Sequence, residues 1–125
     1  MGLFSGDLER PGILSFDSWR AGRLVVDTGL HALGRSRQEA IDYLLANSPL
    51  APNNIVNEVE RYIGWPGQAL AYKTGQQEIV RLRDEARTAF GSTFDLRAFH
   101  DVVLGSGGVT LPVLRSLIEE WMATE

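Results

Sequence analysis

The stretch from Arg23 to Gly34, RLVVDTGLHALG, carries three ionisable side chains at four-residue spacing among apolar and small residues. This spacing places Arg23, Asp27 and His31 on one stripe of an α-helix, and Arg20 extends the stripe by a turn. The opposite face carries Val and Ala instead of solvated side chains, so we expect the helix to be covered nearly all round.

The stripe requires polar partners if it is buried, because an unpaired buried charge is costly. Four-residue spacing lets Asp27 reach both Arg23 and His31, so the sequence predicts a buried polar network. In a structural interpretation, Arg23 and Asp27 form an ion pair that fixes the helix register, and His31 is a satisfied core histidine. In a functional interpretation, the stripe faces a cleft and holds a ligand.

Start and stop signals divide the whole chain into helices. The expected helices run from a Ser15 or Asp17 cap to about Leu33, from a Ser36 and Glu39 capping box to about Asn47, from an Asn53 or Asn54 cap to about Gly64, from Pro66 to about Phe90, from an Asp95 cap to about Leu104, and from Pro112 to about Met122. No segment shows a sustained two-residue alternation typical of strands. The sequence therefore predicts an all-α fold, with residues 1–125 forming a single domain of about six helices.

A second constellation of polar and aromatic residues occupies residues 57–75. On the long helix, the core-facing stripe begins with Gln68, Tyr72 and Gly75 before it becomes apolar. This change indicates that the start of the helix borders a cavity. The pattern alone slightly favours an interior Tyr72, with a backbone partner for its hydroxyl, over a catalytic one.

Composition excludes several classes of function. The 125 residues carry a formal net charge of -4 and no basic block, which argues against nucleic-acid binding. There is no cysteine and no apolar stretch long enough to span a membrane. The chain shows no secretory signal, so a cytoplasmic location is the default expectation. With two histidines, neither followed by Glu, it contains no His-Glu-x-x-His zinc motif, and we expect no metal site and no cofactor in this chain.

Three segments strongly resemble, in the same order, the C-terminal part of the bacterial family called domain of unknown function 885. They read WRAGRLVVDTGLHALGRSRQEAIDYLL, EVERYIGWPGQALAYKTGQQEIVRLRDEAR and FDLRAFHDVVLGSGGVTLPVL, and the resemblance extends from about Leu3 to about Trp121. Members of the family are mostly helical and resemble zinc metallopeptidases of the gluzincin type. Their His-Glu-x-x-Pro-Gly-His motif, and a later Glu-Gly-Trp-Ala segment, lie upstream of the matched region. The resemblance therefore implies a fragment of a larger metallopeptidase-like fold, with zinc expected only in a full-length relative.

The resemblance also implies roles for particular residues. By analogy with related helical metallopeptidases, Tyr72 and His31 would contact the substrate or stabilise its oxyanion. Arg61, Tyr62 and Gln68 would line the same cleft, and Arg23 and Asp27 would hold His31 in place.

These observations lead to two functional hypotheses. In the first, the chain is a C-terminal fragment that is inactive alone and works with an N-terminal, zinc-bearing metallopeptidase half. In the second, it is a stand-alone helical interaction module that forms a homo-oligomer, because a domain cut from a larger fold exposes an apolar face. An independent hydrolase would have to bind zinc and cleave peptides by itself.

Overall fold

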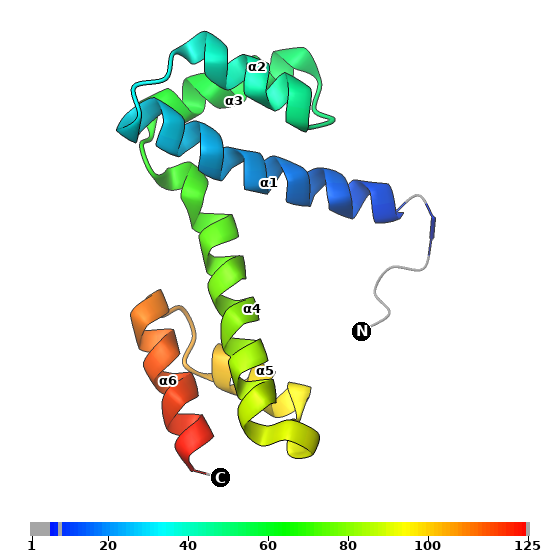
Figure 1. The fold of residues 1–125 in the computed structure, drawn as a ribbon, viewed down its shortest axis with the longest axis vertical. Coiled ribbons are helices and arrows are strands. Elements are labelled where there is room, and N and C mark those ends of the chain that lie inside the picture. The colour runs from blue at the N-terminus through cyan, green and yellow to red at the C-terminus, as the bar shows by residue number, and fades with distance from the viewer. Residues whose placement is uncertain (1–5, 8, 125) are drawn as a thin grey trace. The chain divides into compact units, whose positions relative to one another are not determined.

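The computed structural model describes residues 6, 7 and 9–124; Leu3, near which the family resemblance begins, lies outside this part of the chain. The described residues form six α-helices and two short 3-10 helices and contain no β-strand (Figure 1). This result confirms the predicted all-α fold. The elements are α1 (Glu9–Ala32), α2 (Arg37–Asn47), α3 (Pro52–Gly64), η1 (Gln68–Leu70), α4 (Ala71–Phe90), η2 (Gly91–Thr93), α5 (Leu96–Gly105) and α6 (Leu111–Ala123).

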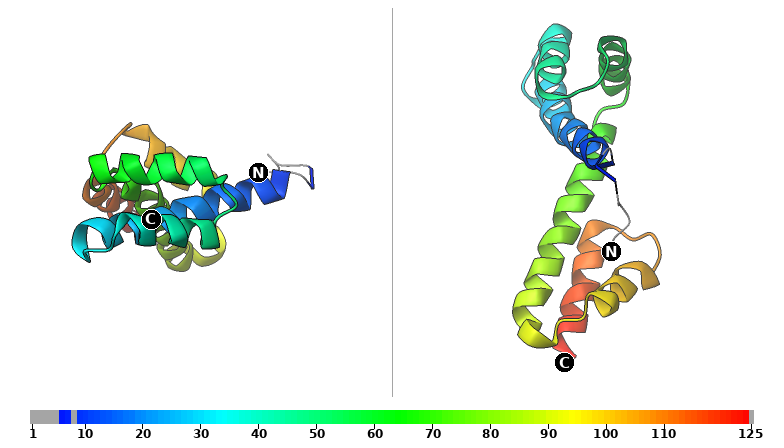
Figure 2. Two further views of the ribbon diagram at one scale, coloured as in Figure 1. Left: turned by 90° about the horizontal axis from the view of Figure 1, so that it is seen from above. Right: turned by 90° about the vertical axis from the view of Figure 1, so that its right-hand side faces the viewer.

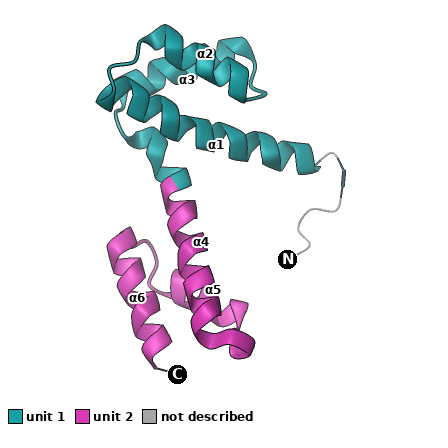
Figure 3. Ribbon diagram, in the orientation of Figure 1, with its two compact units in different colours: residues 1–73 teal, residues 74–125 magenta. Residues whose placement is uncertain are grey.

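The chain divides into two compact units, residues 1–73 and residues 74–125 (Figure 3). Unit 1 contains α1, α2, α3, η1 and the first residues of α4, and unit 2 contains the rest of α4 with α5 and α6. The expectation of a single domain stays a prediction.

Unit 1 is held together by the packing of α1 against α2, α3 and η1. Its core consists of buried side chains from all four elements: Val26, Ala40, Ile41, Leu44, Ile55, Val59, Tyr62 and Ala69. Gly22 lets α1 approach α2 closely, because a Cβ atom at this position would lie 3.0 Å from Cδ2 of Leu44. Gly22 is therefore a point of close approach between α1 and α2.

Unit 2 has a separate apolar core, made by Leu82, Ala86, Phe99, Leu114 and Ile118. Within this unit α6 lies alongside the second part of α4, as the views in Figures 1 and 2 show. Phe90 and Trp121 form an edge-to-face pair with ring centroids 4.7 Å apart, which closes one end of the core. Each unit thus buries an apolar face of its own.

Two predicted helix starts are confirmed. Ser36 and Glu39 form the full capping box, in which each side chain bonds to the backbone N–H of the other residue. Asp95 caps α5 by accepting a hydrogen bond from the backbone N–H of Arg97.

Three predicted helix starts are wrong, for identifiable reasons. Helix α1 begins at Glu9, well before Ser15, because Pro11 lies in the first turn, where its missing N–H is not needed. Helix α3 begins at Pro52 instead of after an asparagine cap, since proline suits the first helical position. The chain after Pro66 first makes the 3-10 turn η1, and the α-helix starts at Ala71.

The expectation that the first long helix is covered nearly all round is also wrong. Val25 is 37% exposed and Leu33 is 66% exposed. The polar stripe on the other face is the buried part of this helix: Arg23 is 4% exposed and Asp27 is 2% exposed. In the central part of α1, the face that carries the charged residues is therefore the buried face.

Candidate functional site

A buried arginine lies at the centre of a polar cluster in unit 1. The guanidinium carbon of Arg23 lies 5.6 Å from the ring centroid of Trp19, 5.5 Å from that of Tyr62 and 5.4 Å from that of Tyr72. Three aromatic rings at these distances stabilise a cation through their π faces. The Nε atom of Arg23 is buried and has no hydrogen-bond partner among the described residues.

Gln68 joins this buried arginine to a second, partly exposed arginine. Its Oε1 atom accepts hydrogen bonds from Nη2 of Arg23 at 3.1 Å and from Nη1 of Arg61 at 2.8 Å. The 3-10 turn η1 carries Gln68 to this position, directly after the left-handed residue Gly67, whose φ is +82°. Three of the predicted site residues therefore lie in contact.

Tyr62 continues the cluster through its hydroxyl group. It is 1% exposed; its oxygen accepts a hydrogen bond from Nε1 of Trp19 at 3.0 Å and donates one to Oε2 of Glu58 at 2.7 Å. Arg61 donates to both oxygens of the same carboxylate, at 2.6 Å and 3.2 Å. A continuous chain of hydrogen bonds thus connects α1, α3 and η1.

The pKa values of Glu58 and Tyr62, which lie in this row of hydrogen bonds, are shifted in opposite directions. Burial alone would raise the pKa of Glu58, but hydrogen bonds from Arg61 and Tyr62 outweigh it, and the pKa lies below its ordinary value. Burial raises the pKa of the Tyr62 phenol, and the bond to the Glu58 carboxylate raises it further. Glu58 is therefore ionised and Tyr62 neutral at neutral pH.

Asp27 does not form the predicted bonds to Arg23 and His31. Both of its carboxylate oxygens lie 3.1 Å from the backbone nitrogen of Gly67, which donates to them. Within the described residues, no ion pair joins Asp27 to Arg23. The prediction of burial is correct for Arg23 and Asp27 and wrong for His31, which is exposed. The partners of the two buried residues come from the turn after α3 instead of from the same helix.

His31 contacts a neighbouring helix through its ring. Its Nε2 atom lies 3.0 Å from the backbone oxygen of Tyr62, and because a carbonyl oxygen can only accept, Nε2 carries the proton. The side chain lies at the exposed end of α1. The structure therefore brings His31 to the backbone of a site residue and not to Asp27.

Tyr72 lies at the surface of the cluster. It is 57% exposed, and its ring centroid lies 5.2 Å from the guanidinium carbon of Arg20 and 5.4 Å from that of Arg23. Arg20 also lies over the ring of Phe16, at 5.3 Å. The expectation of an interior tyrosine is therefore wrong: Tyr72 covers two guanidinium groups and faces solvent.

Sequence reasoning placed Arg20 on the polar stripe of the first long helix but did not include Trp19, Glu58 and Gly67 among the site residues. A signal for two of them exists, because Trp19 is four residues before Arg23 and Glu58 is four residues before Tyr62, which places each pair on one helix face. The backbone contact of Gly67 has no such signal, since it depends on the path of the turn.

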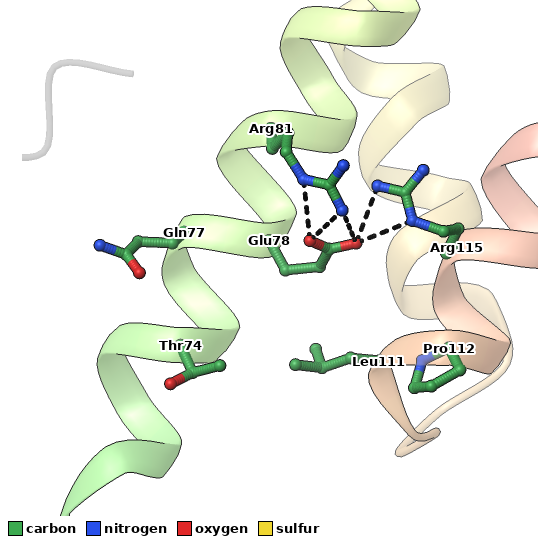
Figure 4. Close-up of a pocket in the computed structure, with 7 residues that line it drawn as sticks. All are labelled: Thr74, Gln77, Glu78, Arg81, Leu111, Pro112 and Arg115. Carbon is green, nitrogen blue, oxygen red and sulfur yellow. Dashed lines mark hydrogen bonds and ion pairs between the residues drawn. The ribbon is translucent and has the colours of Figure 1, made fainter. Parts of the chain in front are cut away.

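Unit 2 holds a surface pocket with a different character. Its volume is about 510 Å³, and its lining residues are Thr74, Gln77, Glu78, Arg81, Leu111, Pro112 and Arg115. Figure 4 shows the Glu78 carboxylate between the guanidinium groups of Arg81 and Arg115, which approach it to 2.6 Å and 3.0 Å. Because these arginines already pair with carboxylates, the pocket offers little unpaired charge to a ligand.

The part of the chain that the structure describes contains no group of three or more His, Cys, Asp or Glu side chains placed to hold a metal ion. The donor set that a peptidase zinc ion requires is therefore not met by these residues. Within the same part, no helix combines the length and the apolar character needed to cross a lipid bilayer.

Comparison with known proteins identifies a family and a similar solved structure. The crystal structure of a "putative lipoprotein" from Colwellia psychrerythraea is similar to this chain, with a TM-score of 0.88 and 45% sequence identity. The similarity covers 90% of this chain and 19% of the Colwellia protein, so the chain spans about a fifth of that protein's length. The curated proteins contain no match. Since the similar protein is described as a lipoprotein, the cytoplasmic location stays a prediction.

The family model named "Bacterial protein of unknown function (DUF885)" matches residues 1–118, which include all of unit 1 and most of unit 2. The match confirms the resemblance found in the three sequence segments. The chain belongs to this family of bacterial proteins of unknown function.

Proposed function

We propose that this chain supplies residues to the substrate side of a metallopeptidase-like cleft, whose zinc ligands lie outside the chain, and that it is inactive alone. The observation that carries the proposal is the contact between residues selected by the family resemblance. Arg61, Tyr62 and Gln68 belong to one chain of hydrogen bonds, next to the exposed Tyr72. The partial match to the much longer Colwellia protein supports a contribution to a larger molecule.

Within this proposal, Tyr72 is the residue that contacts the substrate. Its hydroxyl group is a hydrogen-bond donor beside two guanidinium groups, a setting that suits a carbonyl oxygen gaining negative charge. Neighbouring residues fix one of these cations, since Gln68 and the aromatic ring of Trp19 hold Arg23. His31, whose Nε2 atom is engaged by the Tyr62 backbone, would contact substrate through the rest of its ring.

The proposal can be tested in a chimera in which this chain replaces the matched segment of the full-length Colwellia protein. We expect the chimera to contain zinc and to cleave peptides, and the purified chain alone to do neither. Replacing Tyr72→Phe should lower kcat about 100-fold, the usual effect of losing one donor to a developing oxyanion. Tyr43→Phe, a change on α2 outside the cluster, is the matched control. A Tyr72→Phe chimera as active as its parent, or a parent without zinc and activity, would contradict the proposal.

A second candidate function, a helical module that forms a homo-oligomer, is favoured by apolar side chains on the surface of α1. Leu14 is 68% exposed and Phe16 is 53% exposed, and neighbouring Ile13 is 39% exposed. Self-association would remove such side chains from water. Sedimentation equilibrium of the purified chain tests this function, and a monomer at high protein concentration would rule it out.

A further inference from the structure

The strongest unexplained feature of the polar cluster is the incomplete pairing of Arg23. This side chain is 4% exposed, and it donates a single hydrogen bond among the described residues, from Nη2 to the neutral amide of Gln68. Its Nε atom is buried without a partner. The Glu58 carboxylate interacts with Arg23 only through space. Burying a guanidinium group without a directly bonded carboxylate costs free energy that the neighbouring rings offset only in part. The Nε–H of Arg23 is thus a donor without an acceptor among the described residues.

The charges around Arg23 do not balance either. The cluster contains three guanidinium groups, those of Arg20, Arg23 and Arg61, and two carboxylates, those of Asp27 and Glu58. Glu58 is paired with Arg61, and Asp27 accepts from a backbone N–H, so neither neutralises Arg20. The nearby Lys73 is paired with Asp17 at 2.6 Å and adds no net charge. One positive charge is left over.

A single negative charge therefore matches the cluster better than a double one. A carboxylate would bring one charge and two oxygens, which fit the adjacent donors of a planar guanidinium group. A phosphate dianion would exceed the available positive charge and be repelled by Glu58. The chemistry of the site thus favours a carboxylate ligand.

We propose that Arg20, Arg23 and Tyr72 form a binding site for a carboxylate group of a peptide ligand. The unpartnered Nε–H of Arg23 donates to the carboxylate, and Arg20 supplies the second positive charge. The ring of the exposed Tyr72 covers both arginines, so it turns outward when the ligand enters. This inference rests on the proposed function for the peptide nature of the ligand and adds what part of the peptide is recognised.

The carboxylate can come from the C-terminus of a peptide or from an acidic side chain, and three probes separate these sources. The first is acetyl-Ala-Phe with a free C-terminal carboxylate, the second is the same peptide with a C-terminal amide, and the third is acetyl-Glu-amide, whose carboxylate is on the side chain. Each is titrated into the full ¹⁵N-labelled chain while the Nε–H signal of Arg23 is followed by NMR. No metal is needed for this measurement.

We expect the free-carboxylate peptide to move the Arg23 Nε–H signal downfield with saturation, and the amide peptide to leave it in place. A saturable shift with acetyl-Glu-amide would extend the site to acidic side chains; its absence would restrict the site to the chain terminus. The proposal is overturned if neither carboxylate probe gives a saturable shift, or if the amide peptide or inorganic phosphate gives the same shift.

A matched pair of variants tests the role of Arg20 without disturbing the buried arginine. Arg20→Gln removes a partly exposed charge of the site and should weaken binding at least about tenfold, because a charge-assisted contact is lost. Arg37→Gln removes an exposed arginine on α2 that pairs with Glu60, and it should leave binding unchanged. Equal binding by Arg20→Gln and the parent would overturn the assignment of Arg20.

The two proposals fail in different ways. Saturable binding of the free-carboxylate peptide to the chain, with an inactive chimera, would overturn the peptidase function and leave the binding site standing. Peptide cleavage by the chimera, with no preference for a free carboxylate and no shift of Arg23, would overturn the binding site alone.

Discussion

The backbone nitrogen of Gly67 lies 3.1 Å from both carboxylate oxygens of Asp27. The carboxylate is 2% exposed, so this contact fixes the turn after α3 to the buried face of α1. The next residue is Gln68, which bonds to Arg23 and Arg61. The contact between Asp27 and Gly67 therefore positions the residue that links the two arginines.

Replacing Asp27 should show how much this contact contributes to stability. Asp27→Leu leaves the Gly67 N–H without an acceptor and should lower the free energy of unfolding by about 2 to 4 kcal/mol. Asp27→Asn retains an oxygen acceptor and should cost clearly less. Urea denaturation of both variants gives the comparison, and equal losses would show that the charge, not the hydrogen bond, carries the effect.

The hydroxyl of Tyr62 is predicted to stabilise unit 1 through both of its hydrogen bonds. Tyr62→Phe leaves the Trp19 N–H without its acceptor and removes the donor to Glu58, with an expected cost of about 1 to 3 kcal/mol. Denaturation followed by circular dichroism measures this cost. The control is Tyr43→Phe, whose hydroxyl makes no hydrogen bond among the described contacts. A cost no larger than that of the control would contradict the prediction.

Glu58 should make the stability of unit 1 depend on pH in the acid range. Its pKa in the folded chain lies below the ordinary value of 4.5, so the unfolded chain takes up the proton first as the pH falls. The stabilisation is complete above about pH 4.5 and is lost as the pH falls through the lowered pKa. Glu58→Gln should flatten this part of the stability curve, measured by urea denaturation from pH 2 upward. Glu60→Gln on the same helix, whose pair with Arg37 is exposed, should not flatten it.

Two glycines of α1 should respond oppositely to alanine. A Cβ atom at Gly22 would lie 3.0 Å from Leu44, so Gly22→Ala crowds the contact between α1 and α2 and should cost about 1 kcal/mol or more. Gly12 has no neighbouring atom within 4 Å of such a Cβ, so Gly12→Ala should add up to about 1 kcal/mol of helix stability. Thermal unfolding of the two variants measures both changes. Stabilisation by Gly22→Ala would show that Leu44 moves away freely.

Arg115 should hold α6 to α4 within unit 2. It bonds to Glu78 and Glu85 on α4 and to Glu119 on its own helix. Arg115→Gln should therefore speed amide hydrogen exchange in α6 more than in α2, which lies in unit 1. Arg97→Gln, a change of an exposed arginine on α5, serves as the control. Unchanged exchange in α6 would show that the apolar core of unit 2 suffices.

Helix starts could be predicted from the sequence where the capping signal depends on residues only a few positions apart. The capping box of Ser36 and Glu39 and the cap of Asp95 depend on bonds within a few residues, so the sequence alone predicts them. The start of α3 could not be predicted in this way, because Asn53 and Pro52 both suit a helix start and the proline prevails.

The sequence predicted several residues of the candidate site but not the contacts between them. Helical spacing placed Arg23 and Asp27 on a buried face, as observed. It could not indicate that Gly67 and Gln68, about forty residues later in the chain, would provide their partners, because these contacts depend on the path of the turn after α3. Tyr72 was expected inside, and its exposure depends on the same turn.

The left-handed backbone of Gly67, with φ of +82°, makes this position sensitive to chirality. An L-residue would be strained there, whereas a D-residue favours positive φ. A chain assembled by chemical ligation with D-alanine at this position keeps the backbone N–H that donates to the Asp27 carboxylate. It also restricts the conformations that the unfolded backbone can adopt. An L-configured Cβ at this position would meet no atom within 4 Å among the described residues, so the penalty for an L-residue comes from its positive φ and not from crowding. At position 67, the chirality of the residue, and not the chemistry of its side chain, therefore determines how well the turn beside the arginines is stabilised.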